Sequence, residues 1–119
     1  YITSSIIIGS TIFTPPTSPL TAISGTQLLT CQSNRFIDNS TNNFTITVAG
    51  NTSINSFDPF VPNSSYSTYG SGYFDGTGDY LYAGSSTAFQ YGTGDFTYEC
   101  WVYHTTISGQ QTYFARTNI

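Results

Sequence analysis

The sequence predicts an all-β protein, an antiparallel sandwich or barrel built from short strands. No stretch carries apolar residues at helical spacing over a useful length, because Ser, Thr, Gly and Asn interrupt every candidate window. Apolar and polar residues instead alternate over short runs that are bounded by turn-forming residues. The 119 residues are 38% hydrophobic and 17% aromatic, a composition that predicts folding rather than disorder. Together these observations predict one β-rich domain.

The chain opens with a strand segment and a linker. Residues 1–13 are rich in Ile and Thr, with a break at Gly9, and predict the strand segment. Residues 14–25 form the linker, because three prolines within residues 14–19 favour an extended, polyproline-like connector. The β-rich body is predicted over residues 26–119. A strand ahead of a stiff linker cannot bury its own faces, so we expect it to pair with this body or with a neighbouring molecule.

Two strands are predicted in the first part of the body. Residues 27–32 are one candidate. Residues 43–48 are a clearer one, because Phe, Ile and Val alternate there with Thr. The next residues, Ala-Gly-Asn at 49–51, predict a turn.

The second part of the body contains a predicted hairpin and the clearest strand. Residues 73–74 and 80–82 flank a glycine-rich loop at 75–79, as expected for a hairpin. Residues 95–103 alternate over their whole length. The face expected to contact the core carries Phe96, Tyr98, Cys100 and Val102, and the opposite face carries Thr97, Glu99, Trp101 and Tyr103.

The charge balance excludes two classes of partner. The formal charge is −4, with no Lys and only Arg35 and Arg116 as cations, so the chain cannot replace the counterions around nucleic-acid phosphates or bind an anionic membrane surface. Its apolar runs are too short to insert into a membrane. A surface of hydroxyls, amides and tyrosines suits an extracellular or virion location and puts little long-range repulsion between copies, so self-association is expected.

Cys31 and Cys100 are the only cysteines and form a candidate disulfide. Their pairing would close a long loop and stabilise the fold by about 4 kcal/mol on the chain-entropy model. The alternative is two free thiols that act as small apolar residues.

Three segments of the sequence resemble one family of extracellular modules. Residues 72–81 read Gly-Tyr-Phe-Asp-Gly-Thr-Gly-Asp-Tyr-Leu, and residues 88–103 contain Phe-Gln-Tyr-Gly-Thr-Gly-Asp-Phe-Thr-Tyr-Glu-Cys-Trp-Val. Residues 28–40 add a strand followed by an Asp-Asn-Ser turn. Together these segments resemble the opening of a laminin-G-like, concanavalin A-like jelly-roll module, over about residues 26–115. Modules of this kind occur in bacteriophage structural proteins, particularly those of marine and cyanobacterial phages.

The resemblance implies a jelly-roll β-sandwich that is incomplete within this chain. Residues 1–19 resemble the last strand and exit linker of a preceding module. We therefore expect the chain to span the end of one module, the linker and the first half of the next module in a tandem array. The implied function is that of a non-enzymatic structural module of a virion appendage or other extracellular fibre. The alternative is a glycan-binding adhesin module that recognises cell-surface saccharides.

An enzymatic function is not expected, although glycoside hydrolases use the same sandwich. Such enzymes need two carboxyl groups roughly 5–10 Å apart. Glu99 is the sole glutamate, and Asp95 on the same strand face is four residues away, about 13 Å at 3.3 Å per residue. This pair is too far apart. A tertiary pairing of Glu99 with Asp75 or Asp79 is the alternative that stays open, and no catalytic residue is predicted.

Three aspartates are candidate calcium ligands. Asp75, Asp79 and Asp95 lie beside glycines in loops, as Ca²⁺-binding carboxylates of lectin-like sandwiches often do. The alternative is ordinary turn chemistry, in which the carboxylate accepts backbone N–H groups. No other cofactor is predicted.

Tyrosines are the strongest surface signal. Tyr80, Tyr82 and Tyr91 lie in or near loops rich in Ser and Gly, and Tyr offers a large contact area with a polar tip. We therefore predict these three as carbohydrate-binding residues. Packing against neighbouring subunits, or filling a sandwich core, are the alternatives.

Overall fold

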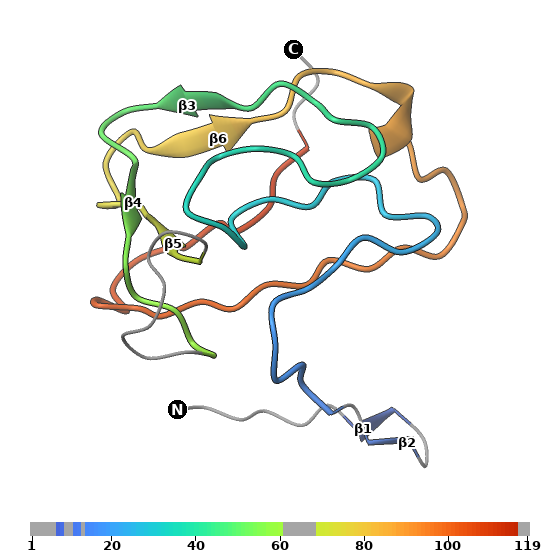
Figure 1. Cartoon of the computed structure of the whole chain (residues 1–119), viewed down its shortest axis with the longest axis horizontal. Coiled ribbons are helices and arrows are strands. Elements are labelled where there is room, and N and C mark those ends of the chain that lie inside the picture. Colours follow the sequence, from blue (N-terminus) through green and yellow to red (C-terminus); the bar gives the residue numbers. More distant parts are fainter. Residues whose placement is uncertain (1–6, 9–10, 13, 61–68, 117–119) are drawn as a thin grey trace.

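The computed structural model describes residues 7–8, 11–12, 14–60 and 69–116, and the structural statements below refer to them. Within these ranges there is no α-helix, and every paired strand is antiparallel, so the β-rich class is confirmed (Figure 1). The elements in chain order are β1 (Ile7–Ile8), β2 (Thr11–Ile12), β3 (Thr47–Ala49), β4 (Ser53–Asn55), β5 (Ser71–Tyr73), β6 (Tyr80–Tyr82) and the short 3-10 helix η1 (Thr87–Phe89).

Strands β3 to β6 form a bent two-stranded ribbon. β3 pairs with β6, placing Val48 opposite Leu81, and β4 pairs with β5, placing Ile54 opposite Gly72. The ribbon turns sharply between the two pairs (Figure 1). The predicted hairpin about residues 75–79 is therefore wrong, since β5 and β6 do not pair with each other. β5 and β6 instead pair with strands that precede them in the chain, β4 and β3. The loop that joins β5 to β6 is an excursion of the chain, that is, a loop that leaves one side of the ribbon and returns to it.

One carboxylate ties this excursion to the opposite side of the ribbon. Asp79 Oδ1 accepts a hydrogen bond from Asn51 N at 2.8 Å, and its Oδ2 accepts one from Asp75 N at 2.8 Å. Gly50 has φ +72°, a conformation that glycine adopts without steric cost. The turn predicted at residues 49–51 is confirmed at this position.

A second carboxylate organises the chain before the ribbon. Asp38 is only 4% exposed, and its Oδ1 accepts hydrogen bonds from Leu29 N at 3.0 Å and Ser40 N at 2.8 Å. Its Oδ2 accepts from Phe44 N at 2.9 Å and from Ser40 Oγ at 2.8 Å. Asn39 N donates to Leu29 O at 2.8 Å. One side chain thus holds three separate backbone positions together.

The other predicted strands are shorter than expected or absent. Residues 27–32 contain no strand, because the Leu29 N–H donates to a side-chain carboxylate and not to a neighbouring strand. The strand predicted at 43–48 begins only at residue 47, since Asn43 has φ +49° and interrupts the extended run. Residues 95–103 contain no assigned strand, because no partner strand lies beside them in the described part of the chain.

β1 and β2 pair with each other. Ile7 lies opposite Ile12 and Ile8 opposite Thr11. Neither strand contacts another of the described elements, and the hairpin lies apart from the rest of the chain (Figure 1). The segment was expected to pair with the body or with a neighbouring molecule, and its described strands pair internally; residues 1–6, 9–10 and 13 lie outside the described residues. The predicted division of the chain, by a linker at residues 14–25 between the strand segment and the β-rich body, stays a prediction.

Residues 14–60 and 69–116 enclose no apolar core. None of their hydrophobic side chains is buried, and their buried polar side chains are Asp38, Ser40 and Asp58. The solvent-accessible surface is 9508 Å², whereas a folded protein of this mass exposes about 6,300 Å². The radius of gyration is 15.3 Å, against about 13.5 Å for a compact domain of this length. Large apolar side chains are open to solvent as well, among them Phe96 at 60% and Ile107 at 85% exposure.

Candidate functional site

The most prominent surface feature is a group of four aromatic rings, here termed the 91–114 cluster, made of Tyr91, Phe96, Tyr98 and Phe114. Tyr91 stacks on Phe96 at 4.9 Å between ring centroids, and Tyr98 stacks on Phe114 at 4.7 Å. Tyr98 Oη also donates to Tyr91 Oη at 3.0 Å. Phe96 is 60% exposed, so the cluster presents ring surface to solvent.

A tight turn brings Tyr91 over Phe96. Gly94 N donates to Tyr91 O at 3.0 Å, and Gly92 within this turn has φ +58°. Upstream, Ser86 caps η1 by accepting a hydrogen bond from Ala88 N at 3.1 Å. The glycine-rich sequence before the aromatic run is thus what folds the chain back and stacks the rings.

The opposite face of residues 95–103 carries two more ring contacts. Trp101 meets Phe60 edge-on at 5.6 Å, and Tyr103 meets Phe57 at 5.6 Å. Successive side chains therefore contact different partners on the two faces, as the alternation predicted. These contacts anchor the segment from both faces.

The prediction that one face of this segment contacts a core is wrong. Phe96, Tyr98, Cys100 and Val102 are all exposed. The physical reason is that no second layer of chain lies over this face in the described residues. The ring contacts of Phe96 and Tyr98 are with each other, with Tyr91 and with Phe114.

The three predicted carbohydrate-binding tyrosines make no ring contact with one another. Tyr80 and Tyr82 occupy alternate positions of β6 and are 59% and 37% exposed. Tyr91 belongs to the 91–114 cluster, and none of its ring contacts involves β6. Burial and then the contact with Tyr98 raise the pKa of Tyr91 to about 12, so its hydroxyl stays protonated at neutral pH. Carbohydrate binding by these residues stays a prediction.

Two of the predicted calcium ligands, Asp75 and Asp79, accept hydrogen bonds from backbone N–H groups in turns. Asp75 Oδ1 accepts a hydrogen bond from Thr77 N at 2.7 Å, and Asp79 accepts the two backbone bonds described above. Asp95 lies exposed beyond Gly94, away from this loop in sequence. Across residues 14–60 and 69–116, no group of three or more His, Cys, Asp or Glu side chains is arranged to hold a metal ion. Calcium binding stays a prediction.

Both cysteines are free thiols in the structure. Cys31 is partly buried and Cys100 is exposed. Burial raises the pKa of the Cys31 thiol, and the nearby Cys100 adds to that increase. Burial also raises the pKa of Cys100, with a further contribution from Glu99. The disulfide between them stays a prediction.

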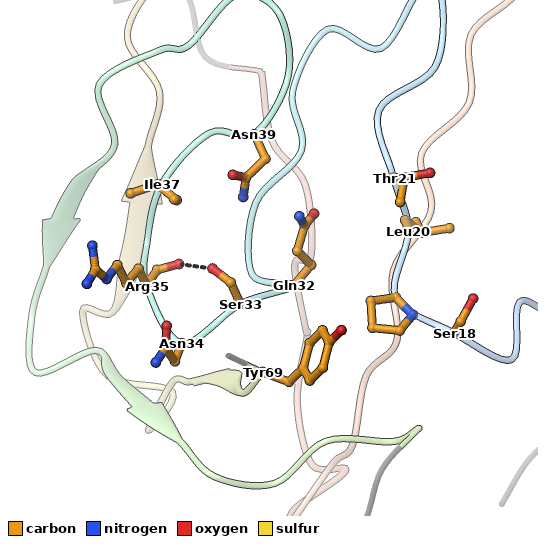
Figure 2. A pocket seen from close by; sticks show the side chains of 11 residues that line it. Ser18, Leu20, Thr21, Gln32, Ser33, Asn34, Arg35, Ile37, Asn39 and Tyr69 are labelled. Carbon is orange, nitrogen blue, oxygen red and sulfur yellow. Dashed lines mark hydrogen bonds between the residues drawn. The ribbon is translucent and has the colours of Figure 1, made fainter. Parts of the chain in front are cut away.

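A hollow of about 550 Å³ lies between the proline-rich linker and residues 32–39 (Figure 2). Tyr69 forms part of its wall, and Ser33 Oγ donates to Arg35 O at 3.3 Å at its edge. Gln32 Oε1 is buried without a hydrogen-bond partner. The Arg35 side chain lies opposite Leu20 and points away from the hollow (Figure 2). Hydroxyls and amides of the lining alternate with the apolar side chains of Pro19, Leu20 and Ile37.

The sequence analysis did not predict three further members of the aromatic surface, which are Phe57, Phe60 and Phe114. Phe114 follows no alternating run, and the two earlier phenylalanines lie in a Pro-containing loop. Their aromatic character was the one signal available. Only the folded chain brings them to residues 95–103.

The comparisons with known proteins returned no relatives. No protein-family model matches the chain, and neither a curated protein nor a solved structure matches it. In the described residues, no helix has the length and apolar character needed to cross a membrane.

Proposed function

We propose that this chain is a non-enzymatic structural module of an extracellular fibre or a bacteriophage virion appendage. In this proposal copies assemble through β-strand and β-sandwich packing, and a concanavalin A-like jelly roll is completed only in the assembly. The 91–114 cluster and the Trp101–Phe60 contact become internal to it. The low charge of the chain leaves little repulsion between copies.

The observation that carries this proposal is the open apolar surface. Phe96, Tyr98, Trp101 and Tyr103 are 60%, 48%, 47% and 77% exposed, so their apolar faces are open to a partner. Exposed aromatic rings on both faces of residues 95–103 are the parts that a partner would cover.

The mass of the purified chain in solution tests the proposal. Light scattering coupled to size-exclusion chromatography should give masses well above 13.0 kDa, and electron microscopy should show regular assemblies. A homogeneous, well-folded monomer over the whole accessible concentration range would contradict it.

A glycan-binding adhesin is the second candidate, and the exposed 91–114 cluster favours it. Aromatic faces stack on sugar rings, and Phe96 and Tyr98 are 60% and 48% exposed. A glycan array should then show saccharide binding that Phe96→Ala abolishes and Ile107→Ala preserves. Ile107 is the matched control because it is 85% exposed and lies outside the cluster. Binding that survives Phe96→Ala would exclude the cluster as the site.

A further inference from the structure

Residues 95–103 have an open backbone edge. Figure 1 shows them as part of a long stretched run, in orange, that crosses beneath the ribbon. Among the described residues, no hydrogen bond is made by the backbone N–H or C=O groups of this segment. Unpaired groups along an extended segment are a template for another strand.

Side-chain contacts already hold this segment in place. Phe96 and Tyr98 are stacked within the 91–114 cluster on one face, while Trp101 contacts Phe60 on the other. Both faces of the segment are therefore held by side-chain contacts. Its backbone N–H and C=O groups, which lie between the two faces, remain unpaired. An anchored strand loses less conformational freedom when it pairs, so the segment is prepared to accept a partner.

We propose that the partner is residues 95–103 of a second copy, paired antiparallel about a two-fold axis at Cys100. This proposal rests on the proposed function, since it names the first contact of the assembly. Two-fold dimers are the commonest protein oligomers, and they use one self-complementary patch. The anchored, unpaired segment is such a patch.

The side chains select the register. An axis at Glu99 would set two carboxylates directly opposite each other, which destabilises a strand pair. Moving the axis by one residue to Cys100 removes this clash and retains pairs of aromatic with β-branched residues, which stabilise antiparallel strands. The cross-strand pairs are then Cys100–Cys100, Tyr98–Val102, Thr97–Tyr103 and Glu99–Trp101.

Disulfide trapping tests this register. Directly opposite residues in a non-hydrogen-bonded pair have Cα atoms about 4.5 Å apart, within the range of a disulfide. In the Cys31→Ser variant, which removes the other thiol, added diamide should take two electrons and two protons from the two Cys100 thiols. The S–S bond so formed should give a dimer on a non-reducing gel. The double variant with Cys100→Ser should give none.

A proline scan provides an independent test. With Cys100 in a non-hydrogen-bonded pair, the N–H groups of Thr97, Glu99 and Trp101 point toward the partner. Thr97→Pro removes one donor from each copy and should weaken dimerisation about tenfold or more. Thr97→Val keeps the N–H and the β-branched shape, so it should dimerise as the wild type does. Circular dichroism checks that both variants keep the fold.

The outcomes separate this inference from the proposed function. A monomer under all conditions overturns both. A stable assembly without a Cys100–Cys100 disulfide, with unchanged affinity in Thr97→Pro, overturns the strand pairing but leaves the structural role intact. An assembly lost on deletion of residues 1–13 but not in Thr97→Pro would assign the contact to the N-terminal hairpin, and would also overturn the inference.

Discussion

Asp38 shows how one residue replaces a network of strand hydrogen bonds. Its carboxylate is nearly inaccessible, yet no cation pairs with it among the described residues. Backbone N–H groups of Leu29, Ser40 and Phe44 and the Ser40 hydroxyl stabilise the charge instead. Buried polar groups of this kind are costly to leave unpaired, so removing the acceptor should cost more than an ordinary surface change.

We predict that Asp38→Ala lowers the free energy of unfolding by about 2–4 kcal/mol, because it leaves three backbone donors without their acceptor. Urea denaturation followed by circular dichroism measures this loss. Asp95→Ala is the matched control, since Asp95 is exposed and accepts none of the side-chain bonds described here. Equal losses in the two variants would contradict the role assigned to Asp38.

The same carboxylate predicts an acid-sensitive fold. Burial alone would raise the pKa of Asp38, but hydrogen bonds from Leu29, Phe44 and Ser40 outweigh it, so the pKa lies below its usual 3.8. The ionised form is thus favoured in the folded state. Its contribution to the free energy of unfolding is fully present above the unfolded-state pKa of about 3.8. This contribution should be lost as the pH falls through the lower, folded-state pKa. Thermal melts between neutral and acid pH should show this fall, and Asp38→Asn should reduce it.

Among the elements, the bent ribbon depends on close packing at its corner. Gly50 has φ +72°, and a Cβ atom there would overlap Asp79 Oδ1 and lie 2.9 Å from Gly78 O. The Asp79 carboxylate can approach the turn only because residue 50 has no side chain. This corner sets how β3–β6 leads into β4–β5.

We predict that Gly50→Ala destabilises the ribbon by about 2–4 kcal/mol, from the positive φ and from the overlap together. Gly84→Ala is the matched control, because Gly84 has φ +78° and open space around it. It should cost only about 1 kcal/mol. The difference in their melting temperatures measures the overlap alone, and its absence would mean that Asp79 does not occupy the corner.

The sequence placed several strands but did not specify which strands pair with each other. Period-two alternation placed strands near residues 47 and 80, and both exist. The glycine-rich loop at 75–79 predicted that its flanking strands pair, but hairpin chemistry fixes only a local bend. The actual partners are contributed by residues 47–55, a choice that depends on contacts distant in sequence.

For the whole molecule, the composition predicts how the assembly responds to salt. With 7% charged residues and a net charge of −4, few ionic contacts are available to hold copies together. Association driven by apolar surface is not screened by ions. We predict that the assembly mass stays constant or increases as NaCl is raised from about 0.05 to about 1 M. Dissociation at high salt, measured by light scattering, would point to an ionic interface.

The sequence alone determined the β-rich class, the turn at residues 49–51 and the alternating faces of 95–103. These follow from composition and local periodicity, which act over a few residues. The tertiary structure decided which strands pair, which carboxylates accept backbone bonds, and that the face expected to contact a core is open. Those outcomes depend on which distant segments cover one another. Phe96, Tyr98 and Phe114 of the 91–114 cluster are exposed, although their alternating and aromatic sequence is typical of a core.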